Sequence, residues 1–211
     1  MAEPSIGSNI VPSAHPFVFS SADVILLSSD GRKFFVHKNI LSVASPFSNN
    51  VFLPQAPSPD LCPTDEHNQL VSRNHDGLPV IHITEHGSII EPLLRLCYPI
   101  DDPVLTDPHV IRRVLEAAMK YEFSEALQLM KDRLVVLAKT MPLRIYAIAC
   151  ADRLEDVARA AALEVRTSRQ FKKYVDELEE IRAGAYYRLL AYCEKPGPAP
   201  VDQVFCDPPT I

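Results

Sequence analysis

Histidine is the residue type in this sequence whose number and spacing come nearest to a metal or catalytic site. The chain has seven histidines, and His82 and His86 lie four residues apart. The residue pattern places this pair across a strand end and a turn, and neither HExxH nor a CxxC pair accompanies it, as zinc sites of known spacing require. A metal-dependent enzyme using the loop histidines His67, His75 and His86 is therefore an outlying hypothesis, and we expect no metal and no cofactor.

The patterns of nucleophilic and phosphate chemistry are missing from the sequence as well. No two of the six glycines lie within four residues of one another, and no GxSxG occurs. The five cysteines are an odd number without a CxxC, and Cys97 and Cys150 fall on helical stripes where a small buried side chain is the ordinary role. The acidic stretch DELEEIR, residues 176–182, is typical of a solvated helix face. We therefore expect no catalysis.

Length and composition are ordinary for a soluble protein of one or two domains. The 211 residues are 47% hydrophobic and 23% charged, with a net charge of −6 and no long Lys/Arg run. Because phosphate contacts need a basic face, we expect no nucleic-acid binding. The first residues lack the features of a signal peptide, and no run of about 18 apolar residues predicts a membrane span. These features favour a cytoplasmic or nuclear protein.

The first regular elements are two strands and a helix. Residues 23–27 and 33–37 predict the strands, and Asp30-Gly31 between them is a hairpin signal because glycine accepts positive φ. From Lys38 the apolar residues recur at helical spacing, and the proline after Ser45 ends this helix. A hairpin followed by a helix is therefore expected.

Three stretches are rich in proline, and the middle one also has hardly any apolar residues. Residues 1–16 predict a flexible lead-in, residues 54–78 a disordered insertion, and residues 195–211 a disordered tail. The insertion precedes residues 79–83, which predict a third strand.

The rest of the chain is predicted to be helical. Ser88 is the expected cap of a helix over 88–98, and Asp107-Pro108 is the expected start of another. Further helices are expected from Ser124, from Thr140 with Pro142 to a break near Asp152, from there to about 165, and over 175–193. Three short strands followed by many helices predict the α+β class.

His37 and Lys38 join the second strand to the first helix, and two interpretations of them stay open. In one, His37 bonds a nearby carbonyl and packs its ring while Lys38 remains in water. In the other, Lys38 pairs with Asp23, because adjacent hairpin ends bring the two together. A charge pair at a symmetric contact would set orientation more than affinity.

The residues quoted so far resemble the BTB/POZ family. The stretch ADVILLSSDGRKFFVHKNILSVASPFSNNVF is similar to its start, with PVIHI as its third strand, LLRLCY as its tyrosine-ended helix and VIRRVLEAAMKYEFSEALQLMKDRL as its last helical pair. The resemblance covers residues 17–138 and implies a small three-stranded sheet covered by helices, followed by an all-α subdomain. Residues 139–194 are similar to the helical extension of many fungal members.

The resemblance also implies a use. BTB/POZ domains form homodimers or heterodimers with another BTB protein, recruit protein partners, and in many cases bridge a cullin-class ubiquitin ligase scaffold to a substrate. By the motif, Asp23 and Lys38 match a charged pair at the family's dimer interface, His37 is its neighbour, and Leu41 and Phe47 match core positions. A nuclear transcription-linked regulator that recruits corepressors is the alternative function.

Two departures from the family pattern bear on these expectations. Pro99 and IDDPVL follow Tyr98 where the family shows Ser/Thr-Gly and a further strand, which alters the surface near a cullin contact. The lead-in before Phe17 has no helical period, so the swapped N-terminal element of long-form members is not expected. Substrate recognition, if the chain performs it, is expected in the C-terminal helices.

Overall fold

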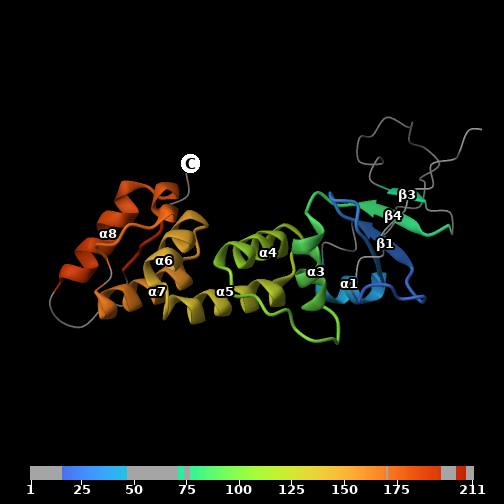
Figure 1. The fold of residues 1–211 in the computed structure, drawn as a ribbon, viewed down its shortest axis with the longest axis horizontal. Helices are drawn as coiled ribbons and strands as arrows, with labels where there is room; N and C mark the ends of the chain where they lie inside the picture. The colour runs from blue at the N-terminus through green and yellow to red at the C-terminus, as the bar shows by residue number, and fades with distance from the viewer. Residues whose placement is uncertain (1–15, 47–70, 74–76, 170, 196–202, 208–211) are drawn as a thin grey trace, which may run out of the picture. The chain divides into compact units, whose positions relative to one another are not determined.

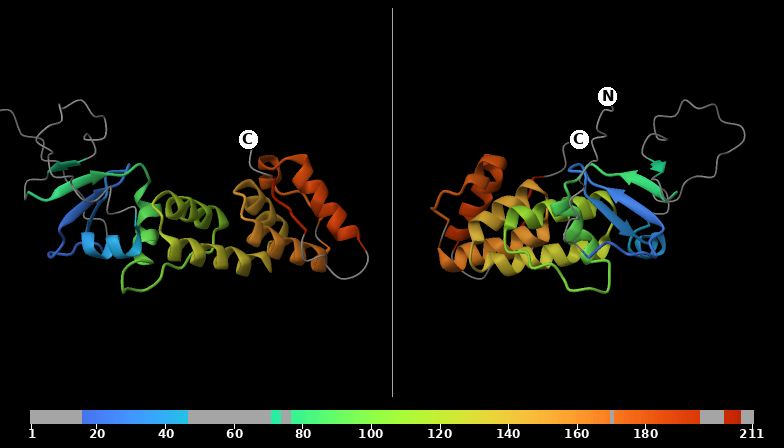
Figure 2. Two further views of the ribbon diagram at one scale, coloured as in Figure 1. Left: turned by 180° about the vertical axis from the view of Figure 1, so that it is seen from behind. Right: turned by 45° about the vertical axis from the view of Figure 1, so that its right-hand side comes forward.

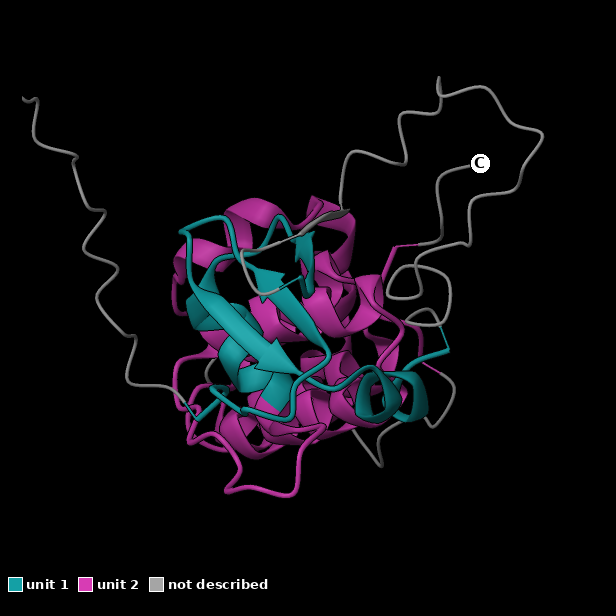
Figure 3. Ribbon diagram, turned by 90° about the vertical axis from the view of Figure 1, so that its right-hand side faces the viewer, with its two compact units in different colours: residues 1–94 teal, residues 95–211 magenta. Residues whose placement is uncertain are grey.

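The computed structural model describes residues 16–46, 71–73, 77–169, 171–195 and 203–207 (Figure 1). The chain divides into two compact units, residues 1–94 (unit 1) and residues 95–211 (unit 2), drawn in teal and magenta in Figure 3. Within the described residues, unit 1 holds every strand and unit 2 is built from helices.

Unit 1 is built on a mixed four-stranded sheet. Its strands are β1 (Val24–Leu27), β2 (Lys33–Val36), β3 (Val71–Arg73) and β4 (Pro79–His82). The order across the sheet is β2-β1-β4-β3, in which β1 pairs antiparallel with β2 and parallel with β4, while β3 pairs antiparallel with β4. The parallel pair requires a crossover between β2 and β4, and helix α1 (Lys38–Ala44) lies in that connection.

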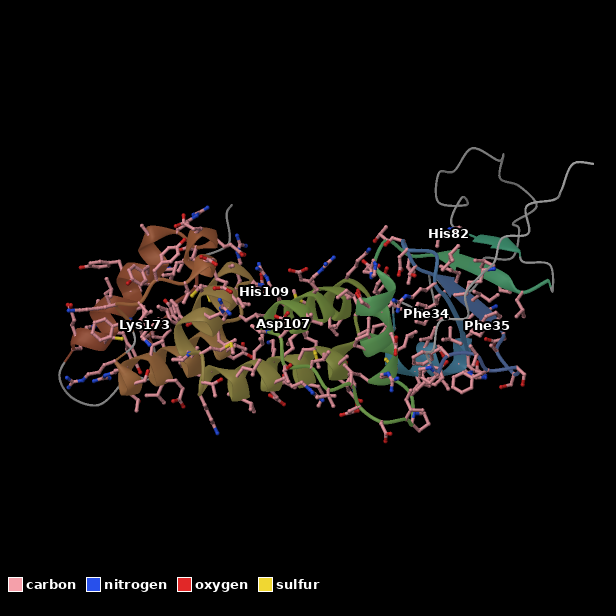
Figure 4. All side chains as sticks on the ribbon, viewed as in Figure 1. Phe34, Phe35, His82, Asp107, His109 and Lys173 are labelled. Carbon is pink, nitrogen blue, oxygen red and sulfur yellow. The ribbon has the colours of Figure 1, made fainter. Side chains whose placement is uncertain are left out.

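The predicted hairpin is confirmed. Gly31 has a φ of 80°, and its N–H donates to the carbonyl of Ser28 at 2.9 Å, which closes the turn between β1 and β2. Side chains alternate along β2, so that Phe34 is fully buried and Phe35 only half-buried (Figure 4).

The fourth strand falls inside the predicted insertion. Residues 54–78 were expected to lack structure, but Val71–Arg73 form β3, with Val71 opposite Ile81 of β4. The backbone groups on the outer edge of β4 need partners, and even a short polar strand can supply them. Residues 54–70, Phe47 and residues 1–15 of the lead-in lie outside the described part of the chain.

Two helices complete unit 1, and both carry apolar residues into its core. Helix α1 buries Leu41, as its motif position predicts, and ends at Ser45. Helix α3 (Gly87–Arg95) buries four apolar residues, Ile89, Ile90, Leu93 and Leu94. Ser88 is not the cap: it lies inside the helix, and its N–H donates to Nδ1 of His86 at 3.2 Å. A histidine nitrogen therefore does what a serine hydroxyl was expected to do.

Unit 2 consists of packed helices (Figure 2). They are α4 (Pro108–Lys120), α5 (Ser124–Ala138), α6 (Pro142–Ala151), α7 (Glu155–Ser168), the 3₁₀ helix η2 (Asp176–Glu180) and α8 (Ala183–Glu194). Helix α5 packs against α4, α6 and α7, and α6 also packs against η2. Among the described helices, none is both long and apolar enough to cross a membrane.

Local signals at two helix ends are confirmed. Asp107 caps α4, accepting the N–H of His109 at 2.9 Å, and Pro108 is the first helical residue, where its missing N–H does no harm (Figure 4). The predicted break near Asp152 is the turn between α6 and α7.

Two predictions in the last third of the chain need correction. The single helix expected over 175–193 is divided into η2 and α8 by Ile181 and Arg182, both with extended ψ. The tail 195–211 was expected to be disordered, yet residues 203–207 are packed on unit 2, with Phe205 only 1% exposed. The cause is a tertiary contact: Phe205 packs against residues that are distant in the sequence, and no local sequence pattern reveals this contact.

One arginine of α4 contacts both the end of α6 and the end of η2. Arg112 of α4 donates to Asp152, which follows α6, through Nη2 at 2.6 Å and Nε at 2.8 Å, and Nη1 donates to Glu180 at the end of η2. Burial alone would lower the pKa of Arg112, but the hydrogen bonds to Asp152 and Glu180 raise the pKa above its ordinary value. The guanidinium thus stays charged and holds three elements at once.

We expect Arg112→Ala to lower the free energy of unfolding of unit 2 by about 2 kcal/mol, because the substitution leaves the carboxylate of Asp152 without its partner. This loss is somewhat smaller than that expected for a fully buried ion pair. Urea unfolding followed by far-UV circular dichroism measures this. Arg113→Ala, at the exposed neighbouring position of α4, is the matched control and should stay within about 0.5 kcal/mol of wild type. Equal losses in the two variants would contradict the assignment.

Candidate interaction surface

Asp23 and Lys38 meet where β1 begins and β2 ends. Because Val24 lies opposite Val36 in the antiparallel pair, the residues flanking these two positions are neighbours. Oδ1 of Asp23 accepts the backbone N–H of Lys38 at 2.8 Å. The sequence correctly predicts that the two residues come together, but the contact uses the backbone of Lys38 and not its ammonium group.

This contact serves the start of α1. The N-cap residue His37 makes no side-chain capping bond, so the first N–H groups of the helix need another acceptor. The Asp23 carboxylate supplies it from a neighbouring strand and places a negative charge at the positive end of the helix. Asp23 is exposed and Lys38 half-buried, so both remain within reach of a partner.

His37 is fixed by its neighbours in the same region. Its Nε2 lies 2.9 Å from Oγ of Ser21, and its ring packs against that of Phe19 with centroids 5.4 Å apart. The ring therefore has a structural role. Beyond it, α1 turns Val43 outward, and this side chain is 89% exposed.

A second polar cluster in unit 1 was not singled out from the sequence. Oδ1 of Asp30 accepts the hydroxyl of Ser28 at 2.6 Å and the N–H of Gly87 at 2.7 Å, while Oδ2 lies 3.1 Å from Nε of Arg32 and 3.4 Å from Nε2 of His86. The hairpin turn thereby caps α3. The Asp-Gly turn signal locates Asp30, but its second role depends on an element 57 residues further along the chain.

Gly87 is needed for this arrangement. A Cβ at this position would lie 2.5 Å from Cδ of Arg32, too close for the two side chains to keep their places. The missing side chain lets Arg32 cross the start of α3 and brings the N–H of Gly87 to Asp30.

In unit 2, the sequence predicts the burial of one titratable residue, Glu177, wrongly. The stretch 176–182 was expected to be a solvated face, but the side chain of Glu177 is 2% exposed. Its Oε1 forms an ion pair with Nε of Arg144 at 2.8 Å and lies 2.9 Å from Nε2 of His109, and neither contact has the geometry of a hydrogen bond. Arg144, the single charged residue of the otherwise apolar α6, was the signal that such a partner exists.

The histidines are not gathered into a metal site in the described part of the chain. Among its residues, no three His, Cys, Asp or Glu side chains lie close enough to hold an ion. His82 is exposed at the end of β4, and His86 caps α3. His67 and His75 lie outside the described residues.

Comparison with protein families matches residues 19–136 to the BTB/POZ domain. The matched span runs from shortly before β1 into α5 and covers more than half of the chain, and the chain therefore belongs to the BTB/POZ family, with the α+β fold expected. No curated protein matches the chain. A BTB/POZ domain is a non-catalytic module that binds protein partners and often dimerises, so protein–protein interaction is the function that the family gives this chain.

The Asp30 cluster predicts how unit 1 responds to acid. Partial burial would raise the pKa of Asp30, but hydrogen bonds from Ser28 and Gly87 together outweigh it and lower the pKa below the ordinary 3.8. A lowered folded pKa means that the contribution of Asp30 to stability is complete above 3.8 and is lost as the pH falls through the folded value.

We expect Asp30→Asn to melt below wild type at neutral pH, because an amide cannot replace the ion pair to Arg32. The difference should narrow as the pH falls from 3.8 through the lower folded pKa, where the wild-type carboxylate is protonated in turn. Thermal melts from pH 7 to pH 2.5 measure it. Asp101→Asn, at an exposed position, is the control, and a gap between wild type and Asp30→Asn that is independent of pH would refute the account.

Proposed function

We propose that this chain is an adaptor: its BTB domain assembles with protein partners, and the helices after residue 138 form a second binding element. The observation that carries the proposal is the Arg112 cluster. Arg112 lies within the matched BTB span, while Asp152 and Glu180 lie beyond its end at residue 136. A partner of the extension would therefore be held by helices continuous with the last helical pair of the BTB domain.

The dimer-interface residues proposed are Asp23, Lys38 and His37. Support comes from the exposure of Asp23 beside the start of α1 and from the apolar Val43 on the outward face of that helix. A rim of charge around an apolar contact is the ordinary anatomy of a protein interface. In a symmetric dimer, the free oxygen of Asp23 is available to the ammonium group of Lys38 from the second copy.

Light scattering after size exclusion tests the dimer. We expect wild type to be a dimer at micromolar concentration, Asp23→Ala to dissociate more readily, and Asp23→Asn to behave like Asp23→Ala. The asparagine keeps an oxygen for the N–H of Lys38 but carries no charge, so it separates the interface role from the capping role. A change in melting temperature confined to Asp23→Ala would report the cap alone.

Two results would count against the interface. One is a wild-type chain that stays monomeric at micromolar concentration, which turns the search to partners of other sequence. The other is a dimer that both substitutions leave intact while Asp23→Ala loses about 1 kcal/mol of stability, the usual value of a helix cap.

The finer form of the proposal is that the adaptor bridges a cullin-class ubiquitin ligase scaffold to a substrate held by the extension. Support comes from family membership and from the segment between α3 and α4, where a cullin contact is expected. That segment turns Val104 to solvent with 89% exposure, so an apolar contact is available in place of the family's usual residues.

A purified cullin scaffold, immobilised beside a BTB adaptor known to bind it, tests this form. We expect wild type to be retained and Val104→Asp to lose retention about tenfold, since a carboxylate in an apolar contact must be desolvated. Leu163→Asp, on the exposed face of α7, is the matched control and should bind like wild type. No retention of wild type, under conditions where the known adaptor binds, would reject the cullin role.

A further inference from the structure

Residues 203–207 pack on the helices of unit 2. They form no helix or strand, with a bend at Cys206, and Val204 is 57% exposed whereas Phe205 is 1% exposed. Cys206 is buried as well, and its thiol lies 3.7 Å from the carbonyl oxygen of Ala149 in α6. The residues that contact the segment come from α6, α7 and α8 of the same unit, and we call the surface that they form the groove.

Side chains of the helices bind the backbone of this segment both by accepting its N–H groups and by donating to a carbonyl. The carboxylate of Glu155, at the start of α7, accepts the N–H of Phe205 at 2.9 Å and that of Cys206 at 2.8 Å. Arg188 of α8 donates to the carbonyl of Phe205 through Nη2 at 2.8 Å and Nε at 2.9 Å. Contacts with the main chain give affinity for an extended peptide independently of its sequence.

Specific recognition comes from two side chains of the segment. The ring of Phe205 stands edge-on to those of Tyr146 and Tyr192, with centroids 5.7 Å and 5.1 Å away. Two positions later, Oδ1 of Asp207 accepts from Nη2 of Arg188 at 2.6 Å. The segment therefore offers the groove an aromatic residue followed at the second position by a carboxylate.

The aromatic pocket is anchored by contacts that do not involve the segment. The hydroxyl of Tyr146 donates to the carbonyl of Ala185 in α8 at 2.8 Å, which fixes the ring from the opposite side. Arg166 of α7 lies over the ring of Tyr192, 5.1 Å from its centroid. The walls are therefore positioned by helix-to-helix contacts, as in a largely pre-formed binding site.

We propose that this groove is a peptide-binding site for a partner segment with an aromatic residue followed two positions later by Asp or Glu, and that residues 203–207 occupy it in cis until such a partner displaces them. The chain's own segment shows the chemistry that fits, down to each backbone contact. The proposal deepens the adaptor function, on which it rests, by giving the extension its class of partner.

Cys206 provides a readout of the occupied groove. In the docked segment, a hydrogen bond with the thiol of Cys150 and then burial raise the pKa of Cys206, so the thiol is both shielded and un-ionised. Thiol reagents attack the thiolate, and alkylation of Cys206 therefore requires the segment to leave the groove. Cys97, outside this groove, is the internal reference in the same digest; burial raises its pKa to about 12.

The test uses the full chain and a fluorescent peptide of residues 201–211 carrying Cys206→Ser. Asp207→Ala in the chain removes one charge-assisted bond from the resident segment, so we expect this variant to bind the peptide about tenfold more tightly than wild type. Cys206 should also be alkylated about tenfold faster in it. Val204→Ala, at the outward position of the same segment, is the matched control and should behave as wild type.

Two further variants distinguish peptide binding in the groove from a simple loss of order in the resident segment. Adding Glu155→Gln to Asp207→Ala should remove peptide binding, and a peptide that also carries Phe205→Ala should not compete. Circular dichroism confirms that each variant is folded. Faster alkylation of folded Asp207→Ala without peptide binding would mean that the segment is only part of the fold, and it would overturn the proposal.

A mass of Asp207→Ala twice that of wild type measured at the same concentration, without added peptide, would also overturn it, because the occupant would then be the segment of a second copy. Neither result depends on cullin retention or on the Asp23 interface. A failed groove and a failed adaptor role can therefore be told apart.

Discussion

Helix α6 is buried on every side from Ile145 to Cys150, and the arrangement of unit 2 follows from this. Its residues 145–150 are all buried, so it lacks the polar face of an ordinary surface helix. Packing it therefore takes several neighbours: α5, α7 and η2 pack against it, α8 accepts the hydroxyl of Tyr146, and the segment 203–207 lies along Ala149 and Tyr146. The helices of the extension therefore pack around the apolar helix α6.

The charges of unit 2 lie where this apolar packing ends. Arg144 meets Glu177, and Arg112 meets Asp152 and Glu180, so that both ends of the short η2 are held by arginines from longer helices. A 3₁₀ helix of five residues has little stability of its own. The ion pairs position it, and it in turn covers α6. The same contacts make α4, the end of α6 and η2 one assembly, which is why residues on either side of position 138 belong to the same unit.

The elements that the sequence predicts well are those specified by local chemistry. The Asp-Gly turn, the Asp107-Pro108 helix start and the break at Asp152 each depend on a few adjacent residues. Strand β3, the burial of Glu177 and the docking of Phe205 depend on residues far along the chain, and no pattern in the adjacent residues predicts them. At the candidate interface, the meeting of Asp23 with Lys38 follows from strand pairing. That the backbone is the partner follows from the lack of a capping bond by His37, which residue types alone do not reveal.

The need to cover α6 also links folding of the extension to binding. When residues 203–207 leave their groove, they uncover Phe205 itself, the two tyrosine rings and the thiols of Cys150 and Cys206, all of which are buried when the segment is docked. Exposed apolar surface of this kind is unfavourable until something covers it again. The resident segment and a partner peptide therefore compete for the same stabilising burial. The affinity of the site is set by the difference between the two occupants, and a partner gains access only by matching the aromatic and carboxylate contacts that the chain already makes with itself.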